Sequence, residues 1–317
     1  MESTQYTVAV IGAGLIGRSW SVAFANAGAA VRLYDPVKKS LEQAEEWLKK
    51  TTTAQDMTED VLSQIKFCTV LEHAVEGVSH VQESTPELLD VKRKLFATLD
   101  QTVPPNVPIY SSTSALLPSE LFKGLLSASR FLIAHPTNPP HIVPLVELVP
   151  SPWTQEGIIS DAISFFEGIG QDVVLLRNEI PGFVLNRLQA ALVNEALRLV
   201  AEGVAKPNEI DKVVSSGLGL RWAFIGPFET MDLNSKYGFA EYAERFKDSY
   251  ITLDRFNSKS NAWNSENISF VAEALRETNS LETISERRTI RDHKILALRE
   301  LKKQFNAAYL RSENGEK

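Results

Sequence analysis

The feature that most constrains the fold is a glycine motif near the N-terminus, set between two short apolar runs. Residues 6–11 (YTVAVI) are rich in β-branched side chains, and GAGLIG follows at once. An apolar-periodic stretch over 19–27 comes next, and a second β-rich run over 30–34 ends in Asp35. This order predicts a strand, a glycine turn, a helix and a second strand, which together are typical of a dinucleotide-binding fold.

Each glycine of the motif has its own physical task. Gly12 permits the tight turn, Gly14 lets the backbone approach a pyrophosphate, and Gly17 lets the helix pack closely on the strand. The pyrophosphate is then expected at the helix N-terminus, where unpaired N–H groups favour an anion.

The residues around Asp35 indicate which dinucleotide binds. Its carboxylate is placed to accept hydrogen bonds from ribose hydroxyls and to repel a 2′-phosphate. Pro36 and Val37 follow it, so no arginine stands there to hold such a phosphate. The sequence therefore predicts NAD, and the nearby Lys38 and Lys39 are the one feature that favours NADP.

Strand-like and helix-like segments continue to alternate as far as residue 176. Further strands are expected over 65–69, 78–82, 107–110, 131–134 and 172–176, and helices over 41–50, 56–64, 88–99, 118–126 and 154–169. Such alternation predicts an α/β fold with a Rossmann-type, doubly wound sheet. Ligands bind beyond the C-terminal ends of the strands in such sheets, and Asp35, Glu87, Ser114 and His135 all follow predicted strands.

The pattern changes after Pro181. A long amphipathic helix is expected over 183–202, helical segments over 207–216 and 285–306, and a turn-rich connection over 217–229. We therefore divide the chain into an NAD-binding Rossmann domain, residues 1–181, and an all-helical domain, residues 182–317. The helical domain is expected to close the substrate cleft and to form a homodimer.

Composition narrows the classes of function. The net charge of −7 without a basic stripe argues against a nucleic-acid partner. No apolar run reaches the roughly 18–20 residues of a membrane span, and the N-terminus lacks a basic-then-apolar signal. The single cysteine, Cys68, fits a reducing compartment. We expect a cytoplasmic protein with no membrane partner and no metal site.

A histidine and a glutamate in the segment 134–149 are the candidate acid/base pair. His135 ends one apolar run, and Glu147 lies inside a second one, LVELV. A carboxylate among aliphatic neighbours is costly to bury unless it is paired. The short loop between the two apolar runs is expected to bring His135 close enough to pair with Glu147. A carboxylate fixes the tautomer of a histidine and supports its protonated form, as general acid/base catalysis requires. An ordinary contact that closes two strand ends is the alternative.

Several segments together resemble the 3-hydroxyacyl-CoA dehydrogenase superfamily. They are GAGLIG with Asp35, TPELLDVK, SSTS, HPTNPPHIVPLVELV and PGFVLNRLQ, in this order and spacing. The motif H-P-x-N-P-P and the segment GLGLRWAFIGPFETMDLN resemble the λ-crystallin and L-gulonate 3-dehydrogenase branch of this superfamily more closely still. The resemblance covers nearly the whole chain and is weakest over 237–282. It implies an NAD-dependent oxidation of a secondary alcohol at C3 of a carboxylic acid or its thioester.

The resemblance also implies which residues carry the reaction. His135 matches the family's catalytic histidine, and Glu147 matches its carboxylate partner. Ser114 matches the serine that hydrogen-bonds the substrate oxygen, and Asn186 matches the asparagine at the start of the helical domain. Two alternatives stay open, because Ser114 could be a helix cap and Asn186 a structural polar group on the long helix.

Further matches concern the cofactor. Leu15, Ile16 and Asp35 match contacts of the dinucleotide loop, and Glu87 and Lys92 match positions that line the nicotinamide side. The alternative for Lys92 is a solvated partner of an acid such as Glu87.

Arg221 is the candidate for substrate choice. It lies in the glycine-flanked segment 217–227, where an enzyme for thioesters has no evident need of a fixed cation. A guanidinium there could hold a free carboxylate through two hydrogen bonds. Arg187, beside Asn186, is the rival, and a surface or interdomain ion pair is the alternative for Arg221.

Three functions are compatible with these residues. The first is oxidation of L-gulonate to 3-dehydro-L-gulonate, or of a similar free 3-hydroxy acid. The second is that of a short-chain 3-hydroxyacyl-CoA dehydrogenase acting, for example, on 3-hydroxybutyryl-CoA. The third is a catalytically idle, crystallin-like NAD-binding protein, and it requires the acid/base pair to be lost, whereas His135 and Glu147 are both present.

Overall fold

The chain forms two compact units in the computed structural model, Met1–Arg187 and Leu188–Lys317. The structure describes residues 6–54, 59–236, 238–257, 266, 269–270, 280 and 282–313. The division between Arg187 and Leu188 places the first turn of the long helix with the first unit. The domain boundary after Pro181 stays a prediction, and each unit is described by itself.

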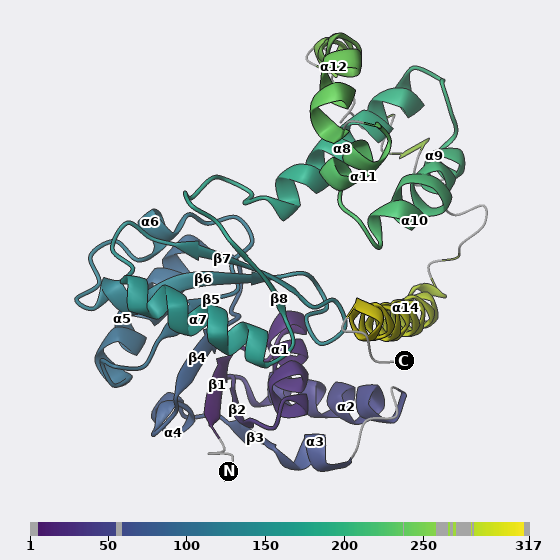
Figure 1. The fold of residues 1–317 in the computed structure, drawn as a ribbon. Coiled ribbons are helices and arrows are strands. Elements are labelled where there is room, and N and C mark those ends of the chain that lie inside the picture. The colour runs from purple at the N-terminus through teal and green to yellow at the C-terminus, as the bar shows by residue number, and fades with distance from the viewer. Residues whose placement is uncertain are drawn as a thin grey trace. The chain divides into compact units, whose positions relative to one another are not determined.

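An eight-stranded sheet forms the centre of the first unit (Figure 1). Its strands are β1 (Thr7–Ile11), β2 (Ala30–Tyr34), β3 (Ile65–Cys68), β4 (His80–Glu83), β5 (Ile109–Ser111), β6 (Phe131–Pro136), β7 (Leu145–Pro150) and β8 (Asp172–Leu175). Their order is β3-β2-β1-β4-β5-β6-β7-β8. Strands β1 to β6 are parallel, β7 pairs antiparallel with β6, and β8 is parallel to β7. The predicted α/β fold class is confirmed.

Helices cover both faces of this sheet. One face carries α1 (Leu15–Asn26), α2 (Lys38–Ala54), α3 (Glu59–Ser63) and α7 (Glu156–Gly168), and the other carries α4 (Leu71–Val75), α5 (Leu89–Thr102) and α6 (Pro118–Leu121). A short 3-10 turn, η1 (Ala128–Arg130), leads into β6. Along β1, Val8 and Val10 face the first group while Ala9 and Ile11 face the second. This alternation follows from the two-residue period of a strand that is buried on both sides.

The first helix begins one turn earlier than the apolar periodicity indicated. Helix α1 starts at Leu15, directly after Gly14, rather than at residue 19. The glycine motif therefore supplies the first turn of the helix as well as the loop. Its N-terminal N–H groups consequently point toward the loop that precedes them.

The second unit is helical throughout the part of it that the structure describes. Its elements are most of α8 (Leu185–Ala201), then α9 (Pro207–Val213), a π-helical turn η2 (Val214–Leu218), α10 (Gly219–Trp222), α11 (Pro227–Leu233), α12 (Gly238–Asn257) and α14 (Ile284–Glu313). Over the described ranges, no helix combines the length and the apolar content needed to cross a bilayer.

The turn-rich connection expected over 217–229 is wrong for most of that range, since only residues 223–226 form a turn between two helices. Residues 214–222 continue as helix, and α11 begins at Pro227. Gly219 adopts right-handed helical angles, with φ −64° and ψ −32°. A glycine inside a helix lowers the stability of that helix by only about 1 kcal/mol relative to alanine. Packing in the folded unit therefore outweighs the preference of the two glycines for a turn.

Candidate active site

The glycine loop between β1 and α1 has the shape that a dinucleotide requires. Gly12 has a positive φ of +108°, and a Cβ there would lie 2.7 Å from the carbonyl oxygen of Ser84. A Cβ on Gly17 would lie 1.8 Å from the carbonyl oxygen of Gly12. Apart from the adjoining backbone, no atom of the described residues lies within 4 Å of a Cβ built on Gly14. Two glycines are therefore required by packing, and the third keeps the backbone open to an incoming group.

The N-terminus of α1 and the end of β2 meet at this loop. Helix α1 has neither a side-chain cap nor an acid in its first turn, which contains Leu15 and Ile16. Its first N–H groups are thus suited to an anion. The carboxylate of Asp35 accepts hydrogen bonds from the N–H of Ala13 at 3.1 Å and of Val37 at 2.9 Å. These residues fit an NAD molecule whose pyrophosphate lies at α1 and whose ribose lies at Asp35.

His135 and Glu147 face each other across the antiparallel pair β6 and β7. The register pairs the two residues directly, so their side chains emerge on the same face of the sheet. Nδ1 of His135 lies 2.8 Å from Oε2 of Glu147. Only 6% of His135 and 2% of Glu147 is exposed, so this contact is shielded from water.

The second carboxylate oxygen of Glu147 binds the start of α8. Oε1 accepts hydrogen bonds from the N–H groups of Val184 and Leu185, each at 2.9 Å. Burial raises the pKa of Glu147, but the hydrogen bonds from His135, Leu185 and Val184 outweigh it and hold that pKa below its ordinary value. An ionised Glu147 accepts a hydrogen bond from Nδ1–H of His135, which leaves Nε2 as the basic nitrogen of the neutral ring.

A left-handed turn aims these two N–H groups at Glu147. Gly182 has φ 79° and Phe183 has φ 50°. Residues other than glycine seldom adopt this left-handed backbone conformation. The Phe183 side chain is fully buried, and its ring centroid lies 5.4 Å from that of His135. The aromatic ring therefore packs against the histidine while its backbone turns the chain into α8.

Ser114 is held through its backbone from two sides. Glu87 Oε1 accepts the N–H of Ser114 at 2.9 Å and that of Ala115 at 3.1 Å. Asn186 Nδ2 donates to the carbonyl oxygen of Ser114 at 2.8 Å. Within the described residues no hydrogen bond uses the Ser114 hydroxyl. Helix α6 begins at Pro118 with Leu117 as its N-cap, so the alternative that Ser114 caps a helix is wrong.

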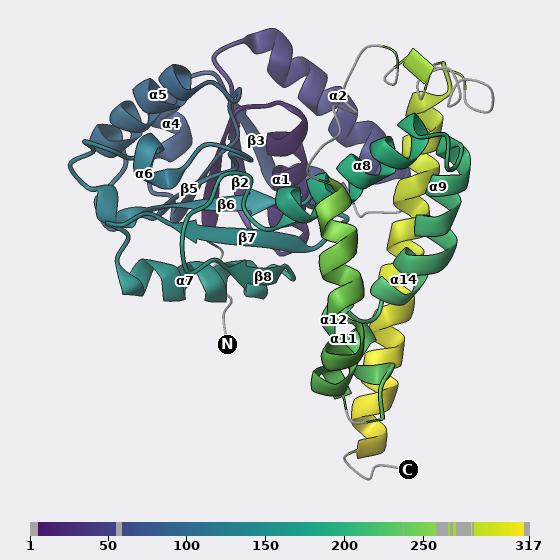
Figure 2. The same ribbon diagram turned by 90° about the horizontal axis from the view of Figure 1, so that it is seen from above.

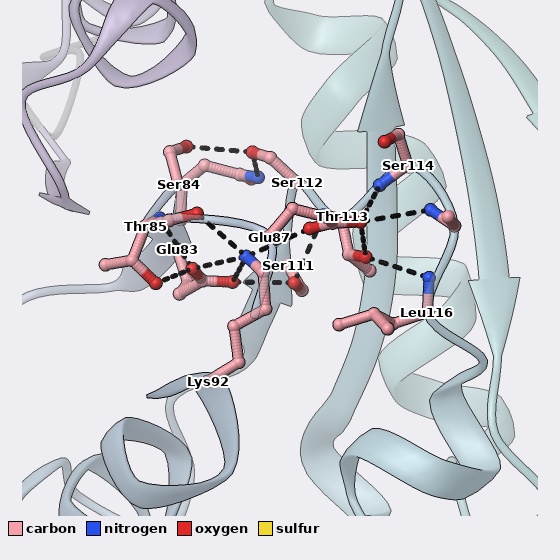
Figure 3. A network of polar contacts seen from close by, with 12 residues as sticks. Glu83, Ser84, Thr85, Glu87, Lys92, Ser111, Ser112, Thr113, Ser114 and Leu116 are labelled. Atoms are coloured by element: carbon pink, nitrogen blue, oxygen red, sulfur yellow. Dashed lines mark hydrogen bonds and ion pairs between the residues drawn. The ribbon is translucent and has the colours of Figure 1, made fainter. Parts of the chain in front are cut away.

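Lys92 is the centre of a buried polar network between β4, β5 and α5 (Figure 3). Only 1% of Lys92 is exposed, and its Nζ donates to both oxygens of Glu83, at 2.7 and 3.0 Å, and to the carbonyl of Thr85 at 3.1 Å. Ser111 donates its hydroxyl to Glu83 Oε2 at 2.6 Å. Glu87 Oε2 lies 3.6 Å from the same Nζ. A solvated Lys92 is therefore wrong, and Glu83 is its principal partner.

Glu83 is a site residue that the sequence reasoning missed. It ends β4 and is fully buried, so its charge needs the lysine that lies nine residues further along the chain. An acid at the end of an apolar strand could have identified Glu83 from the sequence. It indicates a buried counter-ion, but several lysines near it in the sequence qualify equally.

The two arginines considered for substrate binding lie at exposed positions. Arg187 donates from Nη1 to the carbonyl of Pro181 at 3.4 Å. Arg221 lies on α10, in the second unit, whereas the other candidate residues all belong to the first. Within the described ranges, no three His, Cys, Asp or Glu side chains gather in a way that could hold a metal ion.

Comparison with known proteins gives consistent matches along the chain. The family model described as 3-hydroxyacyl-CoA dehydrogenase, NAD binding domain, matches residues 7–180, and the C-terminal domain of the same family matches residues 182–265. Lambda-crystallin from Oryctolagus cuniculus is 46% identical over 250 residues, 76% of this chain and 78% of the relative. L-carnitine dehydrogenase from Streptomyces coelicolor is 39% identical over 247 residues, 75% and 77% of the two chains. The solved 3-hydroxyacyl-CoA dehydrogenase from Archaeoglobus fulgidus shares 29% identity with a TM-score of 0.67, covering 94% of this chain and all of its own.

Proposed function

The chain belongs to the 3-hydroxyacyl-CoA dehydrogenase family and uses NAD, and from this premise we propose that it oxidises the C3 hydroxyl of a small free 3-hydroxy acid. The expected reaction converts L-gulonate to 3-dehydro-L-gulonate. The observation that carries the proposal is the buried contact between His135 and Glu147. It lies at the strand ends, on the edge of the sheet where such folds bind their ligands.

His135 acts as the general base in this proposal. Its Nε2 takes the proton of the C3 hydroxyl as the C3–H bond breaks and the C3–O bond becomes a carbonyl. NAD, when bound, supplies the acceptor for the hydride that leaves C3. The positive charge that develops on the imidazole is stabilised by Glu147, whose Oε2 already accepts from Nδ1. Because that carboxylate is fixed by three hydrogen bonds, it is oriented before the proton moves.

Ser114 and Asn186 align the reacting oxygen. The Ser114 hydroxyl is suited to donate to the substrate oxygen, since the backbone on both sides of it is held. The Asn186 amide contacts the carbonyl of Ser114, which supports a role for Asn186 in positioning the serine. A fixed donor at this oxygen keeps the C3–H bond directed toward the nicotinamide.

The proposed contacts with NAD come from the glycine loop before α1 and from the polar network around Lys92. Leu15 and Ile16 present N–H groups to the pyrophosphate, and Asp35 accepts from the ribose hydroxyls. Glu87 faces the nicotinamide side, and Lys92 acts there through Glu87 because its own Nζ is buried among oxygens of Glu83, Thr85 and Glu87.

A free acid is favoured over a CoA thioester by one of the relatives. The 39% identical relative is named L-carnitine dehydrogenase. L-carnitine is itself a free 3-hydroxy acid. Recognition of a free carboxylate calls for a fixed cation, and Arg221 and Arg187 are the candidates from the sequence. The rival function is that of a short-chain 3-hydroxyacyl-CoA dehydrogenase, and the names of both family models and of a 38% identical relative from Gibberella moniliformis support it.

The test is the rate of NADH formation with matched substrates. L-gulonate, L-carnitine, 3-hydroxybutyrate and 3-hydroxybutyryl-CoA are each offered with NAD and followed at 340 nm. We expect kcat/KM to be highest for a free acid, with L-gulonate first. A higher value for the CoA ester would select the rival function. Absence of turnover with every substrate, together with normal NADH binding, would select the crystallin-like structural role.

A homodimer formed through the helical region is also proposed. Large apolar side chains are exposed along α10 and α11 of the second unit, namely Leu220 at 64%, Phe228 at 73% and Leu233 at 67%. Exposed apolar patches of this kind mark interfaces between proteins. Light scattering coupled to gel filtration is expected to give twice the mass of the chain, and a monomer mass would refute the dimer.

A further inference from the structure

The loop 112–116, which carries Ser114 between β5 and α6, is held by a single carboxylate. Oε1 of Glu87 accepts the hydroxyl of Thr113. The same oxygen accepts the N–H groups of Ser114 at 2.9 Å and of Ala115 at 3.1 Å. Figure 3 shows the Ser114 N–H directed at Glu87, while the Ser114 hydroxyl points away from it. The loop therefore folds around Glu87 and leaves the serine hydroxyl outside that contact.

Thr113 closes this loop on both sides of Ser114. It is fully buried, and its N–H donates to Oγ of Ser111 at 3.3 Å. Its hydroxyl donates to Glu87 and accepts the N–H of Leu116 at 3.1 Å. One side-chain oxygen thus joins the carboxylate to the far end of the loop.

The network behind Glu87 fixes the direction of its carboxylate. Oε2 of Glu87 lies 3.6 Å from Nζ of Lys92, which donates to Glu83 at 2.7 Å. Glu83 also accepts the hydroxyl of Ser111, the residue that receives the N–H of Thr113. Hydrogen bonds to charged groups in an interior of low dielectric constant are strong. The loop therefore takes its position from a carboxylate that is itself oriented from the interior.

The network and the acid/base histidine lie on the same face of the sheet. Helices α4, α5 and α6 cover this face (Figure 1 and Figure 2). Ile109 and Ile133 belong to the core beneath these helices. Ser111 and His135 each follow one of these isoleucines by two residues in the same strand, so their side chains point to the same side.

The start of α8 joins the loop to the acid/base pair. Asn186 Nδ2 donates to the carbonyl oxygen of Ser114 at 2.8 Å. The preceding residue, Leu185, donates its N–H to Oε1 of Glu147 at 2.9 Å, and Oε2 of Glu147 contacts His135. A chain of direct contacts therefore connects the serine to the proposed base.

We propose that Thr113 is a positioning residue, whose hydroxyl acts with Glu87 to fix the Ser114 hydroxyl where it holds the C3 oxygen of the substrate. The proposal rests on the proposed function and deepens it, because it names the group that sets the geometry of this oxygen donor. Loss of the Thr113 hydroxyl removes one of the donors to Glu87 and takes the acceptor from the N–H of Leu116. Ser114 is then no longer held in the position that the reaction requires. The alternative is that Thr113 serves only the stability of the loop.

The test compares two substitutions at Thr113. Thr113→Val removes the hydroxyl at nearly constant shape, and Thr113→Ser keeps the hydroxyl without the methyl group. We expect Thr113→Val to lower kcat about tenfold to hundredfold, as the misplacement of a reacting group by about 1 Å does, with KM little changed. Thr113→Ser should recover most of the lost rate, and both variants should bind NADH as wild type does.

A double-variant cycle separates positioning from stability. Ser114→Ala removes the hydroxyl that Thr113 is proposed to position. Thr113→Val should therefore lower kcat much less in the Ser114→Ala background than in wild type. A threonine that serves only stability would lower kcat by the same factor in both backgrounds, and that result would overturn the proposal.

Thr154 provides a matched control in the same unit. Its Oγ1 accepts the N–H of Ser151 at 2.9 Å and donates to the carbonyl of Phe131 at 2.7 Å. Phe131 begins β6, whereas His135 lies near the other end of that strand. Thr154→Val thus removes the same types of contact far from the loop, and it should lower the free energy of unfolding in urea without changing kcat. An equal fall in kcat in the two valine variants would refute a specific role of Thr113.

Failure of the proposed function is distinguishable from failure of the positioning role. The kinetic tests use the substrate that wild type oxidises fastest, because a free acid and a thioester both present a C3 oxygen to Ser114. If wild type oxidises none, the proposed function fails by itself, and amide hydrogen exchange then tests the loop. The N–H groups of Ser114 and Ala115 should exchange about tenfold faster in Thr113→Val than in wild type, the equivalent of one lost hydrogen bond. Equal protection in the two proteins would overturn the proposal.

Discussion

Glu147 accepts a hydrogen bond from His135 with one carboxylate oxygen, and it accepts hydrogen bonds from the start of α8 with the other. Oε2 lies 2.8 Å from Nδ1 of the histidine, and Oε1 accepts two backbone N–H groups at 2.9 Å. The group that orients the proposed base is therefore also the cap of the helix that leads into the second unit. A change at Glu147 is expected to alter both the acid/base chemistry and the stability of this helix start.

Removal of the imidazole tests the base directly. His135→Ala should lower turnover about 10²- to 10⁴-fold, the typical contribution of a positioned general base. Affinity for NADH, measured by its fluorescence, should change little because the ring lies outside the glycine loop. A variant that turns over at the wild-type rate would show that another group takes the proton.

The pH dependence of stability tests the charge on Glu147. Its pKa in the folded protein lies below the ordinary carboxyl value of about 4.5, so the ionised group stabilises the fold. This contribution is complete above about pH 4.5 and is lost as the pH falls through the lowered pKa. Urea denaturation between pH 3 and 7 should therefore show a steeper acid decline for wild type than for Glu147→Gln. Parallel curves would mean that the carboxylate is not selectively stabilised.

The left-handed turn before α8 predicts an unusual order of two variants. Phe183→Gly and Phe183→Ala both remove the ring that packs on His135, but only alanine keeps a side chain at φ 50°. Glycine relieves a backbone cost of about 1 kcal/mol. The glycine variant should consequently be the more stable by urea denaturation, opposite to the usual order. Both should lower turnover, and an alanine variant more stable than the glycine one would argue against strain at Phe183.

The buried pair of Lys92 and Glu83 predicts a non-additive pair of substitutions. Glu83→Gln removes the principal counter-charge of the buried Lys92 ammonium and leaves only the more distant carboxylate of Glu87. Breaking a buried pair in this way costs about 3–5 kcal/mol of the free energy of unfolding. The double variant Glu83→Leu with Lys92→Met removes both charges and should be destabilised much less. Chemical denaturation of the three proteins checks this order. Equal losses for the single and double variants would show that packing, rather than charge, dominates the site.

Local patterns in the sequence were sufficient for the architecture of the first unit. The run 30–34 is β2 as predicted, and the other predicted strands agree to within two residues at each end. Strand β7 was not predicted as a strand, although its apolar run was noted around Glu147. The glycine motif and Asp35 indicated NAD, because strand periodicity, turn glycines and a terminal acid are all read from neighbouring residues. Even the partner of Glu147 followed from the cost of burying a carboxylate among aliphatic side chains.

The tertiary structure decided which distant groups meet. The antiparallel register of β6 and β7 sets Glu147 opposite His135 and assigns its second oxygen to α8. The adjacency of β4 and β5 joins Ser111 to Glu83 and buries Lys92. Such contacts depend on strand order and on the exclusion of water, neither of which is encoded in local spacing. For the same reason the glycines of 217–229 predicted turns, whereas the folded second unit carries helix there. The sequence by itself determined most elements of the first unit and the cofactor, and packing decided the helices of 214–222 and the partner of each buried charge.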